Sequence, residues 1–272
     1  MAFSSQLYPG EVVIDDGTPE REYVPFAHQS SITDYSTGLQ LPRGHSLEGG
    51  NYEGLAERLP SELLIDESEW QARIQEMEER KTRLSDLMNM HSLPEKDQDG
   101  IPYCWIFGPV QCVEVVRMLQ GQRYVSLSPA SAGAPIKGFR KIGGWGKEGL
   151  QWIADKGLVP TEFWPDCAVN RSYYTEENKQ RALKYRVTEW WELKPRSLKE
   201  QISLLLRRVP GAGGRNYWSH ETMDVEPVWL DGTVAIRGRN QWKGYGDKNF
   251  FILRGNKMLA DDLVAPRVAT SL

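Results

Sequence analysis

The sequence predicts an α+β fold of two lobes, a helical one followed by an antiparallel β one, behind an extended N-terminal arm and a long helix. Apolar residues recur at helical spacing up to about residue 208, and short strand-like runs dominate after it. The glycine-rich stretch 210–214 lies between the two patterns. A chain of 272 residues is long enough to bury a core of this kind.

Residues 1–60 are predicted to form an extended arm. Prolines and glycines recur there, apolar clusters are few, and acidic residues outnumber basic ones. Such a segment cannot bury enough apolar surface to fold alone. We therefore expect it to be ordered by packing against its own domain, or against a protein partner or a second copy of the chain.

Residues 61–96 are predicted to hold one long helix. Asp66 and Glu69 resemble a capping box, and apolar residues from Trp70 to Met88 form one stripe. Pro94 is expected to end the helix.

The domain at 97–272 divides into a helical lobe, about 97–208, and a β lobe, about 209–272. Cys104 to Leu119 is apolar enough for a buried helix, in which Pro109 requires a kink or a late start. Further helices are expected at 147–156, ended by Gly157, and at 198–208, capped by Ser197. Strands are expected at 225–230, 233–237 and 249–253, with a hairpin turn at Asp231-Gly232.

Composition excludes several classes of function. The net charge is −4, so we expect no nucleic-acid partner. No apolar run reaches about 18 residues and no secretory signal begins the chain, so we expect no membrane partner and no secretion. Three cysteines are too few for a disulfide framework and indicate a reducing compartment, the cytoplasm or a virion assembled there. We expect neither a metal site nor a cofactor.

Cys104 has the surroundings of a nucleophile. It begins an apolar helix, whose positive end favours the thiolate, and Gln98 stands six residues earlier, where its amide could donate to an oxyanion. A free cysteine is more commonly a small buried hydrophobe, which is how we interpret Cys112 and Cys167.

His220 is the single imidazole downstream of Cys104, which makes it the candidate base in that region. A histidine beside aromatic residues is otherwise more often a packed side chain. A thiol–imidazole pair needs a third group to orient the ring, and Asn240 follows across the predicted hairpin. Asn240 could equally be a turn residue. Trp242 could shield the amide–imidazole hydrogen bond from water.

The ordered set Gln98, Cys104-Trp105, Gly143-Gly144-Trp145, His220 and Asn240-Gln241-Trp242 resembles the papain/cathepsin-like cysteine peptidases over residues 97–254. The resemblance implies that Cys104 is the nucleophile, His220 the base and later the acid, and Asn240 the group that orients the imidazole. It also implies an oxyanion hole formed by Gln98 and the Cys104 backbone N–H. The implied substrate cleft is lined by Gly143, Gly144, Trp145 and Trp242.

Several residues depart from the family pattern, among them Gln241, which replaces a serine. Tyr103 is bulky where a small residue is usual, Glu221 replaces a small residue after the histidine, and Lys243 stands near a usual glycine. We expect Tyr103 to narrow the cleft and an anionic Glu221 to raise the pKa of the imidazole or tie it up.

Two functions from different classes follow. The first is a cysteine peptidase that cleaves peptide or isopeptide bonds, with a thiol acyltransferase or amidase as a variant of the same chemistry. The second is a weakly active or inactive papain-like fold that serves as a structural or assembly protein, for instance a phage virion component, and contacts neighbours through residues 1–60. In overall pattern the chain resembles papain-like proteins of tailed phages and prophages. The arm could also be an inhibitory prosegment.

Overall fold

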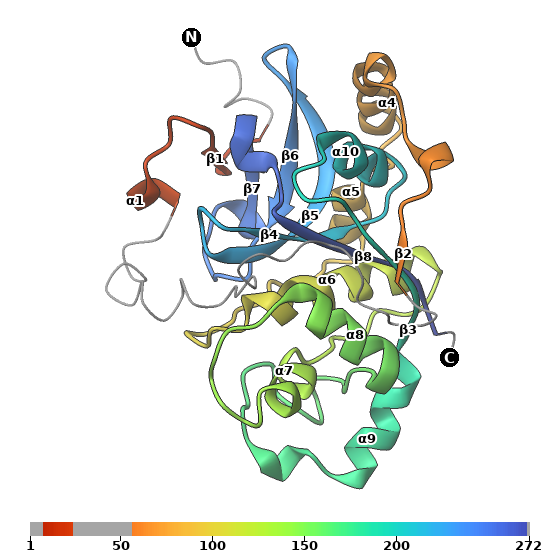
Figure 1. Cartoon of the computed structure of the whole chain (residues 1–272), viewed down its shortest axis with the longest axis vertical. Helices are drawn as coiled ribbons and strands as arrows, with labels where there is room; N and C mark the ends of the chain where they lie inside the picture. Colours follow the sequence, from red (N-terminus) through yellow and green to blue (C-terminus); the bar gives the residue numbers. More distant parts are fainter. Residues whose placement is uncertain (1–7, 24–55, 271–272) are drawn as a thin grey trace.

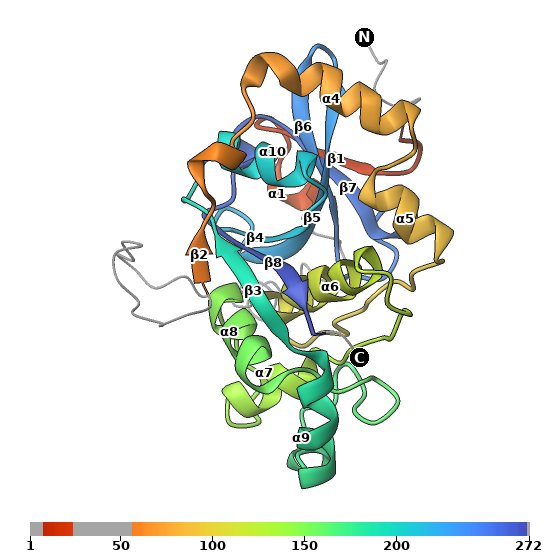
Figure 2. The same cartoon turned by 90° about the vertical axis from the view of Figure 1, so that its right-hand side faces the viewer.

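The computed structural model describes residues 8–23 and 56–270, and much of the arm predicted at 1–60 lies outside these ranges. Figures 1 and 2 show two lobes, with the sheet and its covering helices in one, and α7, α8 and α9 in the other. The α6 helix lies where they meet. The predicted α+β class and two-lobe arrangement are confirmed.

The described elements run along the chain in this order: β1 (Val12–Ile14), α1 (Glu20–Tyr23), β2 (Ala56–Arg58), η2 (Ser61–Leu63), α4 (Glu67–Glu79), α5 (Leu84–Met90), α6 (Cys104–Leu119), α7 (Ala130–Ile136), α8 (Gly146–Lys156), η3 (Arg171–Tyr173), α9 (Glu176–Ala182), η4 (Leu183–Tyr185), β3 (Val187–Glu192), α10 (Leu198–Leu206), β4 (Gly211–Arg215), β5 (His220–Leu230), β6 (Thr233–Arg239), η5 (Asp247–Asn249), β7 (Phe250–Leu253), η6 (Gly255–Met258) and β8 (Asp262–Ala269).

The described strands form one sheet in the order β1-β7-β6-β5-β4-β8-β3-β2. The inner pairs are antiparallel, and the outermost strands, β1 and β2, pair in parallel with β7 and β3. Both outer strands come from the predicted arm. In its described parts, the arm therefore packs against its own domain and covers the two edges of the sheet.

The β5–β6 hairpin forms where the sequence predicts it. Leu230 pairs with Thr233, and the two turn residues, Asp231 and Gly232, have φ angles of 49° and 78°. Two consecutive left-handed residues define the tight turn whose twist matches the flanking strands, and Asp-Gly is suited to it.

The α6 helix is buried along nearly its whole length, as its apolar sequence predicts. Pro109 lies inside it, and the helix nevertheless begins at Cys104, so the late start is not observed. The α6 side chains pack against β5 and β8, which places the N-terminus of this helix beside the beginning of β5.

The long helix predicted within 61–96 is wrong as a single element. It is two helices, α4 and α5, separated at residues 80–83. Lys81 has a φ angle of 51°, which ends α4, and the Asp86 carboxylate accepts the Arg83 backbone N–H, which starts α5. The apolar stripe continues across the break because both helices pack on β5, so spacing alone did not reveal it.

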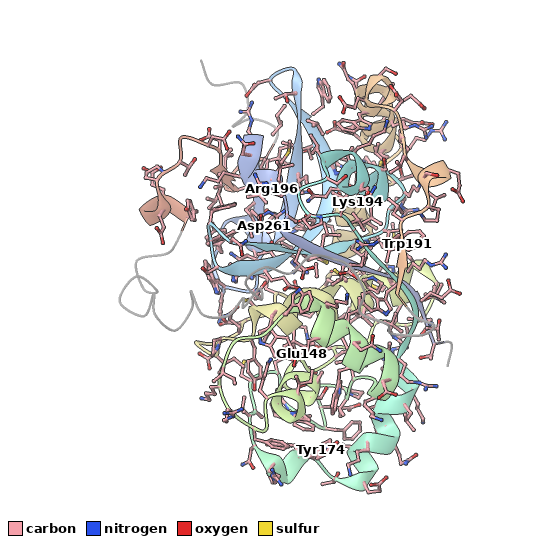
Figure 3. The ribbon with its side chains drawn as sticks, in the orientation of Figure 1. Glu148, Tyr174, Trp191, Lys194, Arg196 and Asp261 are labelled. Atoms are coloured by element: carbon pink, nitrogen blue, oxygen red, sulfur yellow. The ribbon has the colours of Figure 1, made fainter. Side chains whose placement is uncertain are left out.

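The sheet includes strands from outside the predicted β lobe at about 209–272. β3 precedes residue 208, and α10, also before it, packs on β5. The ion pair between Arg196 and Asp261, 3.2 Å between Nη1 and Oδ1, fastens the connection between β3 and α10 to the start of β8 (Figure 3). The lobe boundary at about 208 stays a prediction.

Glycines at 211–214 form β4 rather than a linker. A Cβ at Gly211 would lie 2.7 Å from the Leu263 side chain, and one at Gly213 would lie 2.9 Å from the Asp224 carboxylate. Glycine is needed because neighbouring groups approach this central strand closely. In the sequence, the same glycines look like those of a turn or a linker.

None of the helices in the described ranges is both long and apolar enough to span a bilayer.

Candidate active site

Cys104 is the first residue of α6 and is fully buried. The backbone amides of Glu221, Cys104 and Trp105 favour the thiolate form of Cys104. Burial nevertheless raises the pKa of the Cys104 thiol, and the Glu221 carboxylate raises it further. The resting group is therefore a thiol that needs a base before it can attack.

Close packing of α6 on β5 brings Cys104 to this place. Gly108, one turn further along the same helix face, lies against the Glu221 side chain and the Thr222 backbone. A Cβ at Gly108 would lie 3.5 Å from Glu221 Cγ. Since residues one turn apart share a face, Cys104 faces the first residues of β5, where His220 begins the strand.

His220 is 1% exposed and is held by Asn240, with 2.9 Å between Nε2 and Oδ1. The same Oδ1 accepts the backbone N–H of Gln241 at 2.8 Å. A backbone N–H can only donate, so this contact identifies the atom facing it as the amide oxygen. An oxygen acceptor opposite Nε2 requires the proton on Nε2, and in the neutral ring Nδ1 is then the basic nitrogen.

Aromatic rings enclose the imidazole. Trp242 stacks on it at 4.2 Å between centroids, and Trp218 meets it edge-on at 4.9 Å. The Gln241 amide donates to the Glu221 carbonyl at 2.7 Å. The two ring contacts fix the plane of the imidazole. The shielding of its bond to Asn240 by Trp242 stays a prediction.

Gln98 is joined to the same group by its backbone N–H, which donates to the Gln241 carbonyl at 2.9 Å. Its side-chain Nε2 donates to the Ile101 carbonyl at 2.8 Å. An amide NH2 carries two hydrogens, so one remains for an oxyanion. The six-residue spacing before Cys104 thus gives a buried amide fixed at the N-terminal side of α6.

Solved structures of cysteine proteases resemble this chain. Digestive procathepsin L2 proteinase from Tenebrio molitor larval midgut aligns with a TM-score of 0.58 at 14% identity, over 89% of this chain and 80% of that chain. Xylellain from Xylella fastidiosa aligns with a TM-score of 0.53 at 16% identity, over 66% of this chain and 83% of that one. The chain has the papain-like fold. Digestive procathepsin L 3 of Tenebrio molitor aligns with a TM-score of 0.54 at 17% identity, over 64% of this chain and 66% of that one.

No protein-family model matches the sequence, and no curated protein does. The papain-like fold of this chain is therefore evident from its structure and from the order of a few residues.

The glycines expected in the papain-like cleft lie beside the helix of Cys104. Gly143 and Gly144 are buried, and a Cβ at Gly144 would lie 2.5 Å from the Trp105 ring. Trp145 is the N-cap of α8 and is hydrogen-bonded to the Asp262 carboxylate. Gly144 thus permits close contact with Trp105, which is a packing role that the sequence did not predict.

Two buried carboxyls flank this region, and neither was predicted as a site residue. Glu221 is fully buried with its carboxyl against Gly146, and burial raises its pKa well above the ordinary value. Burial raises the pKa of Asp262 to about 7. Glu221 is thus held towards its neutral form. When it is ionised, its charge raises the pKa of the Cys104 thiol.

The other departures have structural explanations. Tyr103 is buried in the helical lobe, where its ring packs beside Gly133 and its hydroxyl donates to the Arg140 carbonyl at 2.8 Å. Gly133 leaves the space that the bulky ring fills. Lys243 is exposed.

Cys104 and His220 have almost no exposed surface, at 0% and 1%. In the part of the chain that the structure describes, no three or more His, Cys, Asp or Glu side chains are grouped to hold a metal ion.

Proposed function

We propose that the chain is a papain-like cysteine peptidase in which Cys104, His220, Asn240 and Gln98 have the roles that the sequence implies. The single observation that carries this is the hydrogen bond of 2.9 Å between His220 Nε2 and Asn240 Oδ1. Asn240 Oδ1 accepts a hydrogen bond from the Nε2–H, which leaves Nδ1 as the nitrogen that can accept a proton, and Cys104 faces the same end of β5.

The reaction follows from these roles. His220 Nδ1 takes the thiol proton of Cys104 while the sulfur attacks the substrate carbonyl carbon, forming the S–C bond. The oxyanion accepts hydrogen bonds from the Cys104 backbone N–H and the second hydrogen of Gln98 Nε2. The imidazolium then protonates the leaving amine as the C–N bond breaks. Water, deprotonated by the same imidazole, releases the acid and restores the thiol.

The test is hydrolysis of fluorescein-labelled casein and a fluorogenic peptide library by the full chain, from pH 4 to pH 8. The Cys104→Ala variant removes the nucleophile. The Cys112→Ala variant is its matched control, because Cys112 is also buried on α6. Hydrolysis by the wild type and the control but not by Cys104→Ala supports the proposal. Equal hydrolysis by all three contradicts it.

A structural or assembly role is the second candidate, and the burial of the proposed catalytic side chains favours it. Cys104 and His220 are buried, and strands from the arm cover both sheet edges. Sedimentation equilibrium of the full chain tests a role in contacting copies of itself. A concentration-dependent oligomer with no hydrolysis at any pH supports this role. An active monomer contradicts it.

A further inference from the structure

A pocket of about 270 Å³ lies beside the end of α5, away from Cys104. Its lining combines apolar side chains, among them Met88, Leu93 and Phe250, with polar or charged ones, among them Glu95, Arg239 and Lys248. A pocket with an apolar wall and a few convergent polar groups is the usual form of a small-ligand site.

Arg239 is a buried cation in this pocket, at 3% exposure. Its Nε donates to the Lys248 carbonyl at 3.2 Å, and its Nη2 donates to the carbonyls of Leu93 and Pro94, both at 3.1 Å. Among residues 8–23 and 56–270, no carboxylate comes within 4.0 Å of the guanidinium and no acceptor pairs with Nη1. Three neutral carbonyls thus make the direct contacts of this charge, and the carboxylates of Glu114 and Glu95 attract it from beyond ion-pair distance.

Arg237, two residues earlier on β6, is also largely buried, but it has carboxylate partners. Its guanidinium also lies over the Phe250 ring, and it pairs with the carboxylates of Glu11 and Glu226. Buried charges are ordinarily paired in this way, because an unpaired one is costly. Arg239 is the exception among these neighbours, and burial lowers its pKa.

Lys248 adds a second positive charge at the rim. It is exposed, and its Nζ donates to Asn89 Oδ1 at 3.0 Å, which uses one of three donors. Glu95 also lines the pocket and is exposed, and it attracts Arg239 without coming within ion-pair distance of it. An anion between Arg239 Nη1 and Lys248 Nζ would accept hydrogen bonds from both groups and offset their positive charge.

We propose that this pocket binds a carboxylate carried on a small apolar group. The carboxylate meets Arg239 and Lys248, and the apolar group lies against Met88, Leu93 and Phe250. A free organic acid and the C-terminus of a peptide ending in an apolar residue share this chemistry. The site is independent of Cys104, so the proposal does not depend on hydrolysis.

The test is isothermal titration of the full chain with N-acetyl-leucine and, as the neutral analogue, N-acetyl-leucinamide. We expect saturable binding of the acid, with a Kd of ~1 mM, and none of the amide. The Lys248→Gln substitution should weaken binding of the acid about tenfold, because it removes one charge-assisted hydrogen bond. The Lys243→Gln variant, an exposed lysine of the same loop outside the pocket, should leave binding unchanged.

Arg239→Met should abolish binding in a folded protein. If this variant fails to fold, the comparison of acid binding by the Lys248→Gln and Lys243→Gln variants is sufficient to test the proposal. A peptide Gly-Gly-Leu that binds at least tenfold more tightly than N-acetyl-leucine identifies a chain terminus as the ligand, and equal binding identifies a free acid. No saturable binding of the acid, equal binding of the amide, or an unaffected Lys248→Gln variant would each overturn the proposal.

Discussion

The side-chain oxygen of Asn240 accepts two hydrogen bonds, one from His220 Nε2 at 2.9 Å and one from the backbone N–H of Gln241 at 2.8 Å. The second bond orients the amide and the first orients the imidazole. Trp242, two residues after Asn240, stacks on the His220 ring. A three-residue segment after β6 therefore sets the position and the tautomer of the proposed base.

Asn240→Ala should lower kcat/KM by about tenfold to a hundredfold, or ~1.4 to 2.7 kcal/mol of barrier. The imidazole loses its Nε2 acceptor, so more of it carries the proton on Nδ1, where it cannot act as a base. Nitrogen chemical shifts of His220 measure this tautomer change separately from activity. Asn216→Ala, at an exposed asparagine, is the control. An unchanged tautomer in the Asn240 variant would refute the orienting role.

Glu221→Gln should lower the pKa of the Cys104 thiol. Burial holds Glu221 towards its neutral form, but at the alkaline pH where the buried thiol ionises, a charged Glu221 raises the thiol pKa by like-charge repulsion. The amide of the variant keeps the shape and cannot acquire that charge. The rate of alkylation of Cys104 by iodoacetamide should rise at lower pH than in the wild type. Glu148→Gln, a change on α8 away from the sulfur, should leave the profile in place. A profile shifted to higher pH would show that the sign is wrong.

Asp262→Asn should flatten the dependence of stability on pH. The folded pKa of Asp262 is raised to about 7, so the protonated form is favoured by folding. This stabilisation is complete below the unfolded pKa of about 4 and is lost as pH rises to 7, and it amounts to at most about 4 kcal/mol. Urea unfolding at pH 4 and pH 7 measures it, with the exposed Asp155→Asn as control. An Asp262→Asn variant that loses as much stability as the wild type over this range would contradict the assignment.

Gly144→Ala should destabilise the chain by about 1 to 3 kcal/mol. The new Cβ would lie 2.5 Å from the Trp105 ring, which must move, and Trp105 adjoins Cys104. Gly17→Ala, where the Cβ meets only ordinary contacts, should change stability by less than about 0.5 kcal/mol. The midpoints of thermal unfolding compare the two, and equal midpoints would remove the packing role from Gly144.

Local signals predicted the elements that carry the proposed site. The apolar run after Cys104 gave α6, and Asp231-Gly232 gave the hairpin that brings Asn240 back to His220. These features depend on neighbours in the sequence, so they can be recognised from it.

Features set by distant packing escaped prediction. The glycines of β4 look like a linker because their reason lies in Leu263 and Asp224, which pack against them. Glu221 and Asp262 belong to different strands, and only the fold buries both beside α8. The pocket at Arg239 likewise depends on the α5 end and the β6 end coming together.

The most direct test of the proposed mechanism is the reaction of the full chain with an epoxide thiol-trapping inhibitor, followed by peptide mass spectrometry. The three cysteines serve as internal comparators, since Cys104 and Cys112 are buried and Cys167 is partly exposed. We expect an adduct on Cys104 alone in the wild type, and no adduct in the His220→Ala variant. Modification of Cys167 with none at Cys104, under conditions where a papain-type enzyme reacts fully, would contradict it.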